Sequence, residues 1–224
     1  MAAEAETGLD FTPCFGGDVR QCVPLITNCV LVRYVEVLRQ IAETLGLPDD
    51  AARWQAEHTT RSNHIRDLCW NETEKLFLEY NFVRDEPIPV KSLSAYWLLW
   101  AGITSGEQAA ALHDSLTLFE HDYGLTFTDR VYDVPHAEFS ALQWSYPVGW
   151  PPMHIMVVEA LSRSGFTSAA QRISEKFLLL MLDEHERTGQ LWEKYNVVDG
   201  SLTIPRERSD SVPFHGWTAS VVCL

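Results

Sequence analysis

The chain has 224 residues and a net charge of −14, with 31 acidic side chains against 17 basic ones. Binding to a nucleic-acid backbone needs a concentrated positive surface, and the sequence holds no cluster of Lys and Arg, so DNA and RNA are excluded as expected partners. Hydrophobic residues make up 46% of the chain and charged residues 21%. This composition is ordinary for a globular protein, and the length is ample for a proper hydrophobic core.

Cysteine usage and the N-terminal sequence bear on the compartment. The number of cysteines is odd and no C-x-x-C pair occurs, so we expect buried, reduced thiols rather than a disulfide framework or a zinc site. The N-terminus lacks the basic start and apolar run of a signal peptide, and no apolar segment of about 18 residues occurs, so we expect no membrane partner. The default compartment is the cytoplasm. The cysteines are Cys14, Cys22, Cys29, Cys69 and Cys223.

The strongest helical pattern runs from residue 24 to 45. Gly46 and Pro48 follow it and predict its end. The segment 48–68 opens with a proline and two acidic residues, which predicts a second, more polar helix. The segment 75–83, KLFLEYNFV, alternates and predicts a short strand or hairpin arm. Apolar residues that recur at three- and four-residue steps along the first helix are Val30, Tyr34, Val37, Leu38, Ile41 and Leu45.

The middle of the chain predicts two further helices and a long connection. The segment 92–102, SLSAYWLLWAG, is short and very apolar, as in a buried helix. The segment 104–119 follows, and Ser105 and Gln108 in it have the spacing of a capping box. The region 120–150 has few long periodic runs, so we expect an extended connection with turns. Long irregular connections are often functional.

The last third predicts another pair of helices, over residues 153–165 and 167–189, each closed by a glycine. The final segment 215–224 predicts the start of one more helix. Helices therefore come in consecutive pairs, and no parallel-sheet pattern or glycine-rich phosphate loop occurs. We expect an all-α fold built from helical hairpins, with residues 1–224 forming a single domain because no linker composition divides them.

Two carboxylates stand out as candidate catalytic groups, because no established catalytic motif and no metal-spaced cluster is present. Asp10 lies in ETGLDFTP, where a glycine and a proline force a turn and the neighbours are apolar. A carboxyl held among apolar groups can stay protonated, as a general acid requires. Glu193 lies in GQLWEKYN, between aromatic residues and just after a glycine that ends a helix. From these patterns alone either residue could equally be a helix cap or an ion-pair partner.

Four segments together resemble the α,α-trehalase family of glycoside hydrolases. QWSYPVGWPP resembles the family segment Gln-Trp-Asp-Tyr-Pro-Asn-Gly-Trp-Ala-Pro, and ETGLDFTP resembles Glu-Ser-Gly-Trp-Asp-Phe-Ser. WEKYN resembles Glu-Lys-Tyr-Asp, and SAYWLLWAGITSGEQA is similar to a Leu-Trp-Ala-Gly-Ile helix pair. The four occur in the family's order. The C-terminal FHGWTASVV is closer to the related processing α-glucosidases, which share the same barrel.

The resemblance implies an (α/α)6 toroid, incomplete at the N-terminus, and inverting hydrolysis of trehalose to two glucose molecules without metal or other cofactor. Asp10 matches the general acid and Glu193 the general base. An inverting pair of carboxyl groups stands roughly 6.5–9.5 Å apart, with a water molecule between base and anomeric carbon. The partner is a small sugar, and the missing part of the toroid implies a homo-oligomer or an absent N-terminal half. The residues implied in substrate binding are Gln143, Trp144, Tyr146, Trp150 and Glu207.

The resemblance assigns a role to residues 143–152, a segment rich in prolines and aromatic side chains. Prolines and Gly149 would hold Trp144 and Trp150 rigidly, so that flat rings meet the apolar faces of a sugar at little entropic cost. The alternative is a loop that merely closes the barrel end with aromatic side chains. The family's aspartate and asparagine are Ser145 and Val148 here, which leaves open another α-glucoside as substrate. A non-catalytic sugar-binding fragment and a structural domain without ligand are the remaining alternatives.

Overall fold

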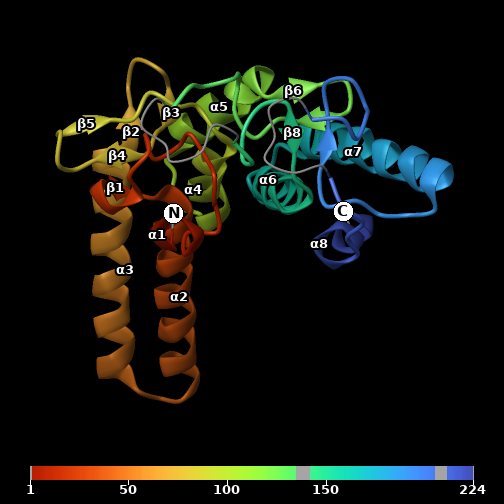
Figure 1. Ribbon diagram of the computed structural model, residues 1–224. Coiled ribbons are helices and arrows are strands. Elements are labelled where there is room, and N and C mark those ends of the chain that lie inside the picture. Colours follow the sequence, from red (N-terminus) through yellow and green to blue (C-terminus); the bar gives the residue numbers. More distant parts are fainter. Residues whose placement is uncertain (1, 135–141, 205–210, 224) are drawn as a thin grey trace.

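The computed structural model describes residues 2–134, 142–204 and 211–223, and helices arranged in an arc dominate it (Figure 1). The expectation of an all-α fold built from helical hairpins is confirmed. The helices are α1 (Ala2–Ala5), α2 (Leu25–Thr44), α3 (Pro48–Cys69), α4 (Tyr96–Ala101), α5 (Gly106–Ser115), α6 (Pro151–Arg163), α7 (Thr167–Thr188) and α8 (Gly216–Ser220).

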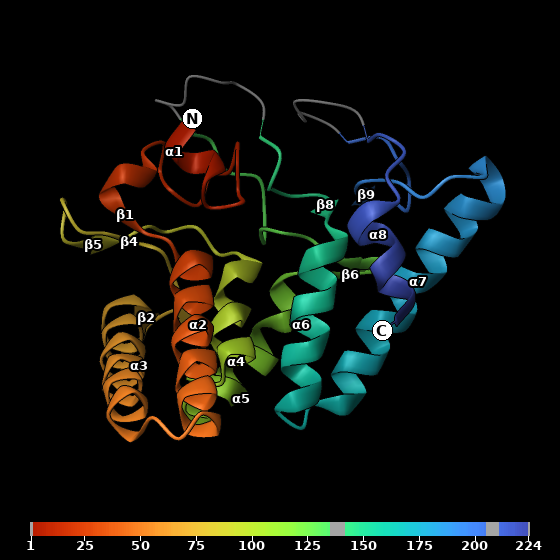
Figure 2. The ribbon, with the colours of Figure 1, turned by 90° about the horizontal axis from the view of Figure 1, so that it is seen from below.

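The helices form an inner and an outer row. Helix α4 packs between α2 and α6, and α6 also contacts α8, so these four stand side by side. Helix α3 packs along α2, and α7 along α6, on the outside of this row (Figure 2). The paired arrangement follows from short connections, which force consecutive helices to run antiparallel as neighbours.

Helix ends follow the local chemistry of the sequence. Gly46 has φ of 70°, and Pro48 opens α3, as the pattern predicts. The capping box is confirmed, because the N–H of Gln108 donates to Ser105 Oγ at 3.1 Å and that of Ser105 to Gln108 Oε1 at 2.9 Å. Helix α6 begins at Pro151, two residues earlier than predicted, because proline needs no N–H partner in the first turn.

Short antiparallel strands lie along the upper side of the arc in Figure 1, from β5 near α3 to β6 and β8 near α7. The predicted strand or hairpin arm at 75–83 is confirmed as β3 and β4. Strand β8 joins β9 across a long stretch of sequence, with Val148 opposite Asn196 and Gly149 opposite Tyr195. The strands are β1 (Cys22–Val23), β2 (Trp70–Asn71), β3 (Leu76–Phe77), β4 (Tyr80–Asn81), β5 (Glu86–Pro87), β6 (Glu120–His121), β7 (Gly124–Leu125), β8 (Val148–Gly149) and β9 (Tyr195–Asn196).

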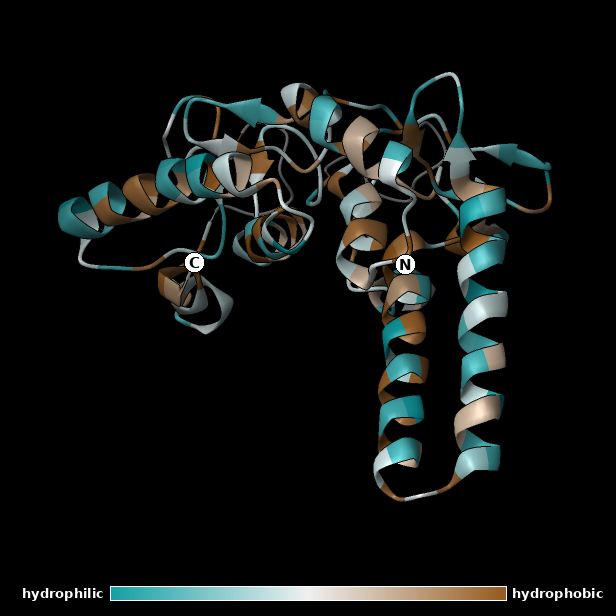
Figure 3. Ribbon diagram, turned by 180° about the vertical axis from the view of Figure 1, so that it is seen from behind, coloured by the Kyte–Doolittle hydropathy of each residue, from teal (hydrophilic) through white to brown (hydrophobic). Residues whose placement is uncertain are grey.

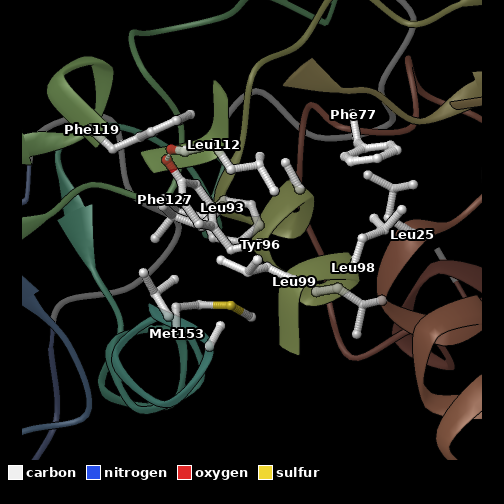
Figure 4. Close-up of a cluster of buried hydrophobic side chains, with 14 of the residues drawn as sticks. Leu25, Phe77, Leu93, Tyr96, Leu98, Leu99, Leu112, Phe119, Phe127 and Met153 are labelled. Carbon is white, nitrogen blue, oxygen red and sulfur yellow. Dashed lines mark hydrogen bonds between the residues drawn. The ribbon is translucent and has the colours of Figure 1, made fainter. Parts of the chain in front are cut away.

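The main hydrophobic core fills the space between α2, α4 and α6 (Figure 4). Tyr96 is buried there, and its hydroxyl donates to the carbonyl of Leu112 at 2.8 Å, so α4 is fixed to α5. The cysteines carry free thiols, as expected; four are buried, whereas Cys223 is exposed. Within the described ranges, none of the helices combines the length and the apolar character that crossing a membrane needs.

The apolar stripe predicted along the first helix faces solvent. Tyr34 is 63% exposed and Leu45 66%. Helix α2 is apolar on a second face as well, where residues such as Cys29 and Val32 pack into the core. Figure 3 shows hydrophobic residues recurring along α2, whereas α3 is mostly hydrophilic. Periodicity detects both stripes of α2 but cannot tell which of them is covered.

A buried carboxyl lies beneath the N-terminal segment. Glu79, between β3 and β4, is 1% exposed, and neither of its carboxyl oxygens has a hydrogen-bond partner among the described residues. Burial raises the pKa of Glu79 to about 8. The folded protein therefore holds a proton here over a pH range in which the unfolded chain has lost it.

We expect Glu79→Gln to flatten the pH dependence of stability. Because the pKa of Glu79 is raised on folding, this carboxyl alone makes the free energy of unfolding fall by roughly 1 kcal/mol per pH unit as the pH rises from about 5 to 8. The neutral amide cannot contribute this slope. Urea unfolding at several pH values in this range measures it for both proteins, and parallel profiles would contradict the prediction.

Candidate active site

Asp10 is fixed from two directions. It is half-buried and precedes Phe11, whose φ of 59° is unusual for a residue other than glycine. The carbonyl of Phe11 accepts the N–H of Gln143 at 2.7 Å, which ties this turn to residues 143–150, here called the Trp loop. The indole N–H of Trp144 then donates to Asp10 Oδ1 at 3.2 Å. The Trp loop thus holds both the backbone and the carboxyl of this turn.

Two indole rings form the centre of the Trp loop. Trp144 and Trp150 stack with ring centroids 3.9 Å apart and planes 17° from parallel. The indole N–H of Trp150 donates to the carbonyl of Gln143 at 3.2 Å, which closes the loop on itself. Phe127 packs its edge on Trp144 at 5.5 Å. Both indoles are buried, so the pair is a rigid block rather than two mobile rings.

Glu193 approaches the same block from the C-terminal part of the chain. Its side chain is 21% exposed, and Oε2 lies 3.5 Å from the ammonium of Lys194. Lys194 is fully buried, and its Nζ lies 5.3 Å from the ring centroid of Trp150. The indole N–H of Trp217 donates to the carbonyl of Glu193 at 3.1 Å, and its ring packs edge-on against Trp150.

A continuous path of contacts therefore joins the two candidate carboxyls, which stand 183 positions apart in the sequence. It runs from Asp10 through the stacked indoles of Trp144 and Trp150 to Lys194 and so to Glu193. The path links the two residues through three intervening side chains. The pairing of Asp10 and Glu193 as acid and base stays a prediction, since an inverting pair also needs room for a sugar and a water molecule between its carboxyls.

The base of the Trp loop is held by His154 on α6. Its Nε2 accepts the N–H of Leu125 at 2.8 Å, and its Nδ1–H donates to the carbonyl of Trp150 at 2.9 Å, which defines one neutral tautomer. The ring stacks on Phe177 with centroids 3.6 Å apart. Burial lowers the pKa of His154 to about 4. At Gly149 a side-chain methyl would come within 3.2 Å of the same imidazole.

The remaining predicted residues occupy different places. Tyr146 is half-buried; its N–H donates to Thr128 Oγ1 at 2.8 Å, and its ring meets the edge of His121. Val148 is buried in the core, and the side chain of Ser145 is nearly so. Glu207 lies outside the described residues.

Sequence reasoning missed Lys194, Trp217 and His154. Lys194 directly follows Glu193, but nothing in the sequence shows that a lysine is fully buried against an indole. Trp217 lies in the segment resembling the processing α-glucosidases, and this was the available signal. Among the described residues, no three His, Cys, Asp or Glu side chains gather as metal ligands.

The paired helices define a toroidal α-fold, and residues 5–223 of the chain match the family model Trehalase. The chain therefore belongs to the trehalase family. It is 27% identical to a cytosolic neutral trehalase of Neurospora crassa, over 87% of this chain and 29% of the relative. It is 28% identical to a cytosolic neutral trehalase of Kluyveromyces lactis, over 88% of this chain and 28% of the relative.

Solved structures agree on the fold. The neutral trehalase of Saccharomyces cerevisiae superposes with a TM-score of 0.75 at 24% identity, covering 87% of this chain and 38% of that one. A mannosylglycerate hydrolase of Thermus thermophilus in complex with glucose gives 0.68 at 23% identity, covering 90% and 47%. The expected toroid class is confirmed, and the described helices form part of such a toroid. The chain spans under a third of the length of the two curated relatives.

We expect stability to fall on the acid side through His154. The pKa of this imidazole is lowered on folding, so between about pH 6.5 and 4 the unfolded chain takes up a proton that the folded protein does not. His154 alone should make the free energy of unfolding fall by roughly 1 kcal/mol per pH unit as the pH decreases through this range, and above about pH 5 this contribution offsets the opposite one of Glu79. His154→Gln should lose this part of the slope, whatever its level of stability at pH 7.

Denaturant unfolding followed by Trp fluorescence measures the two slopes. The exposed His64 on α3 supplies the matched control, His64→Gln, which should keep the wild-type slope. An unchanged slope in His154→Gln would contradict the assignment.

Proposed function

We propose that this chain carries the acid and base machinery of an inverting α,α-trehalase, which hydrolyses trehalose to two glucose molecules. The observation that carries the proposal is the path of contacts from Asp10 through Trp144 and Trp150 to Glu193. Membership of the trehalase family and the names of the curated relatives support the substrate.

Asp10 acts as the general acid in this proposal. Because the indole of Trp144 donates to Oδ1, that oxygen is occupied, and Oδ2 is the oxygen that transfers the proton in this proposal. The proton passes to the glycosidic oxygen as the bond between this oxygen and the anomeric carbon breaks, and the first glucose leaves. The carboxylate produced at Asp10 keeps its hydrogen bond to the indole, which stabilises the charge.

Glu193 acts as the general base. It removes a proton from a water molecule whose oxygen bonds to the anomeric carbon on the face opposite the leaving group, so the configuration inverts. The ammonium of Lys194 lies 3.5 Å from Oε2 and orients this carboxyl. Lys194 is in turn placed by the ring of Trp150.

Gln143, Trp144, Tyr146 and Trp150 are proposed to shape the sugar subsite. Trp150 is almost fully buried, so its contribution is to support Trp144 and Lys194. Tyr146 is the more accessible ring. The residue matched to a further substrate-binding glutamate is Glu207, whose part in the site stays a prediction.

A different glycoside is the second candidate, favoured by the likeness to a mannosylglycerate hydrolase. The substitution at position 148 does not support it, because Val148 is buried and its side chain has no access to a sugar. A panel of glycosides offered alongside trehalose decides between the two substrates.

We further propose that another polypeptide segment covers the exposed apolar face of α2 in the active protein. The stripe around Tyr34 and Leu45 has the periodicity of a packed helix, and leaving it in water is unfavourable. The occupant is either a second copy of the chain or the additional sequence that the longer relatives carry. The cytosolic relatives support the cytoplasm as the compartment.

Glucose release from trehalose tests the proposal. Asp10→Asn and Glu193→Gln should each lower kcat by roughly 10³-fold, since each removes one proton-transfer step. The exposed carboxylates Glu6 and Glu186 give matched controls, Glu6→Gln and Glu186→Gln, which should keep the wild-type rate. Proton NMR of the first turnover should show one α- and one β-glucose per trehalose.

Release of two α-glucose molecules per trehalose would refute the assignment. A wild-type rate in both Asp10→Asn and Glu193→Gln would refute it as well. Turnover that appears only when the remaining sequence of a longer relative is supplied would assign the rest of the site to that sequence.

A further inference from the structure

Glu4 is a buried carboxyl just outside the segment that resembles the family motif. It lies on α1, and only 6% of its surface is exposed. Carboxylates are rarely buried unless they have partners. Here Oε1 accepts the backbone N–H of Thr12 at 2.9 Å, and this bond is itself buried. Burial raises the pKa of Glu4, while the N–H groups of Thr12 and Phe11 act in the opposite direction.

The bond from Thr12 fixes a turn that needs outside support. Phe11 adopts φ of 59°, a conformation that is strained for a residue other than glycine and persists only where the surroundings impose it. Thr12 follows at once and is held by its N–H to Glu4 and by its hydroxyl, which donates to the carbonyl of Trp144 at 3.3 Å. The turn is thus clamped between α1 and the Trp loop.

The same turn sets the direction of Asp10. Asp10 is bonded through its backbone to Phe11, and its Oδ1 accepts the indole N–H of Trp144. The backbone at Phe11 and Thr12 therefore carries Asp10 toward this indole. Among the described residues no hydrogen bond joins Glu4 to the indole or to Asp10, although the Asp10 carboxyl is near enough to add to the rise that burial causes in the pKa of Glu4, so Glu4 holds Asp10 mainly through the backbone of the turn.

We propose that Glu4 is a positioning residue, which locks the turn at Phe11 and Thr12 so that the carboxyl of Asp10 stays against the indole of Trp144. This role rests on the proposed function, in which Asp10 is the general acid. Glu6, two positions away and part of the recognisable motif, is exposed and makes no such contact in the described structure. The buried and the exposed glutamate therefore form a natural pair for comparison.

The indole N–H of Trp144 reports on this geometry without any need for turnover. In a chain labelled with ¹⁵N-tryptophan its resonance is assigned by its loss in Trp144→Phe. Glu4→Ala should shift it toward the position of an unbonded indole, because the turn loses its clamp. Glu4→Gln should stay close to the wild type, since the amide oxygen can still accept the N–H of Thr12. Glu6→Ala should leave it unchanged.

Turnover supplies the second readout. Glu4→Ala should lower kcat on trehalose by roughly 10²-fold with KM within about twofold, because a displaced acid affects the transition state more than substrate binding. Glu4→Gln should recover most of this loss. Thermal unfolding of each variant shows whether the fold is retained. Should Glu4→Ala not fold, Glu4→Asp replaces it, since a side chain shorter by one methylene cannot reach the N–H of Thr12.

The outcomes separate the two proposals. An indole resonance that does not move in a folded Glu4→Ala or Glu4→Asp overturns the positioning role, whatever the rate. The positioning role is also overturned if Glu6→Ala shifts the indole resonance and lowers kcat as much as Glu4→Ala does. A wild-type chain that releases no glucose contradicts the proposed function, while the indole resonance still decides the role of Glu4.

Discussion

The stacked pair of Trp144 and Trp150 is the contact on which the site depends. Stacking of two aromatic rings contributes only about 1 kcal/mol beyond the burial of their surface. Its importance lies in position, because the N-terminal turn attaches to one ring and the C-terminal segment with Lys194 to the other. Segments from opposite ends of the described chain meet on this block. Without it, the hydrogen bonds of each segment would fix local structure but would not bring the segments together.

The support behind the pair explains why polar groups are buried there. The core between the inner helices is apolar, yet four titratable side chains are also buried, those of Glu4, Glu79, His154 and Lys194. Burying such groups costs free energy, even where partners compensate part of it. Burying these four groups lowers the free energy of unfolding, while their contacts fix the backbone and side chains around Asp10 and Glu193. Lower stability around a site with a defined geometry is common in enzymes.

Much of the fold could be predicted from local signals. The helical hairpins followed from periodicity, and the capping box at Ser105 and Gln108 from spacing, because these features depend on neighbours within a few residues. The orientation of α2 could not be predicted from local signals, since both of its faces are apolar with the same period. Only tertiary contacts determine which face is buried. The placement of Val148 in the core is likewise a tertiary fact, set by its pairing with Asn196.

The candidate site was found by resemblance and not by composition. Asp10 and Glu193 carry no local pattern that distinguishes them from helix caps, and only the order of four motifs singled them out. Their connection through an indole pair was beyond sequence reasoning, because a stack needs coordinates for two rings. The burial of Glu4 and Lys194 was hidden for the same reason, since glutamate and lysine are ordinarily surface residues.

Gly149 limits which residues of the Trp loop can be substituted during evolution. A methyl group there would overlap the side chain of Val197 and press on the carbonyl of Leu125, so these neighbours would have to shift. Any other residue carries at least that methyl. In laboratory evolution toward new glycosides, substitutions at position 149 would therefore be poorly tolerated. Substitutions at the half-buried Gln143 and Tyr146 on the same loop would be tolerated better. Diversity in such a loop is restricted to the side chains that face outward, because its backbone path allows no alternative.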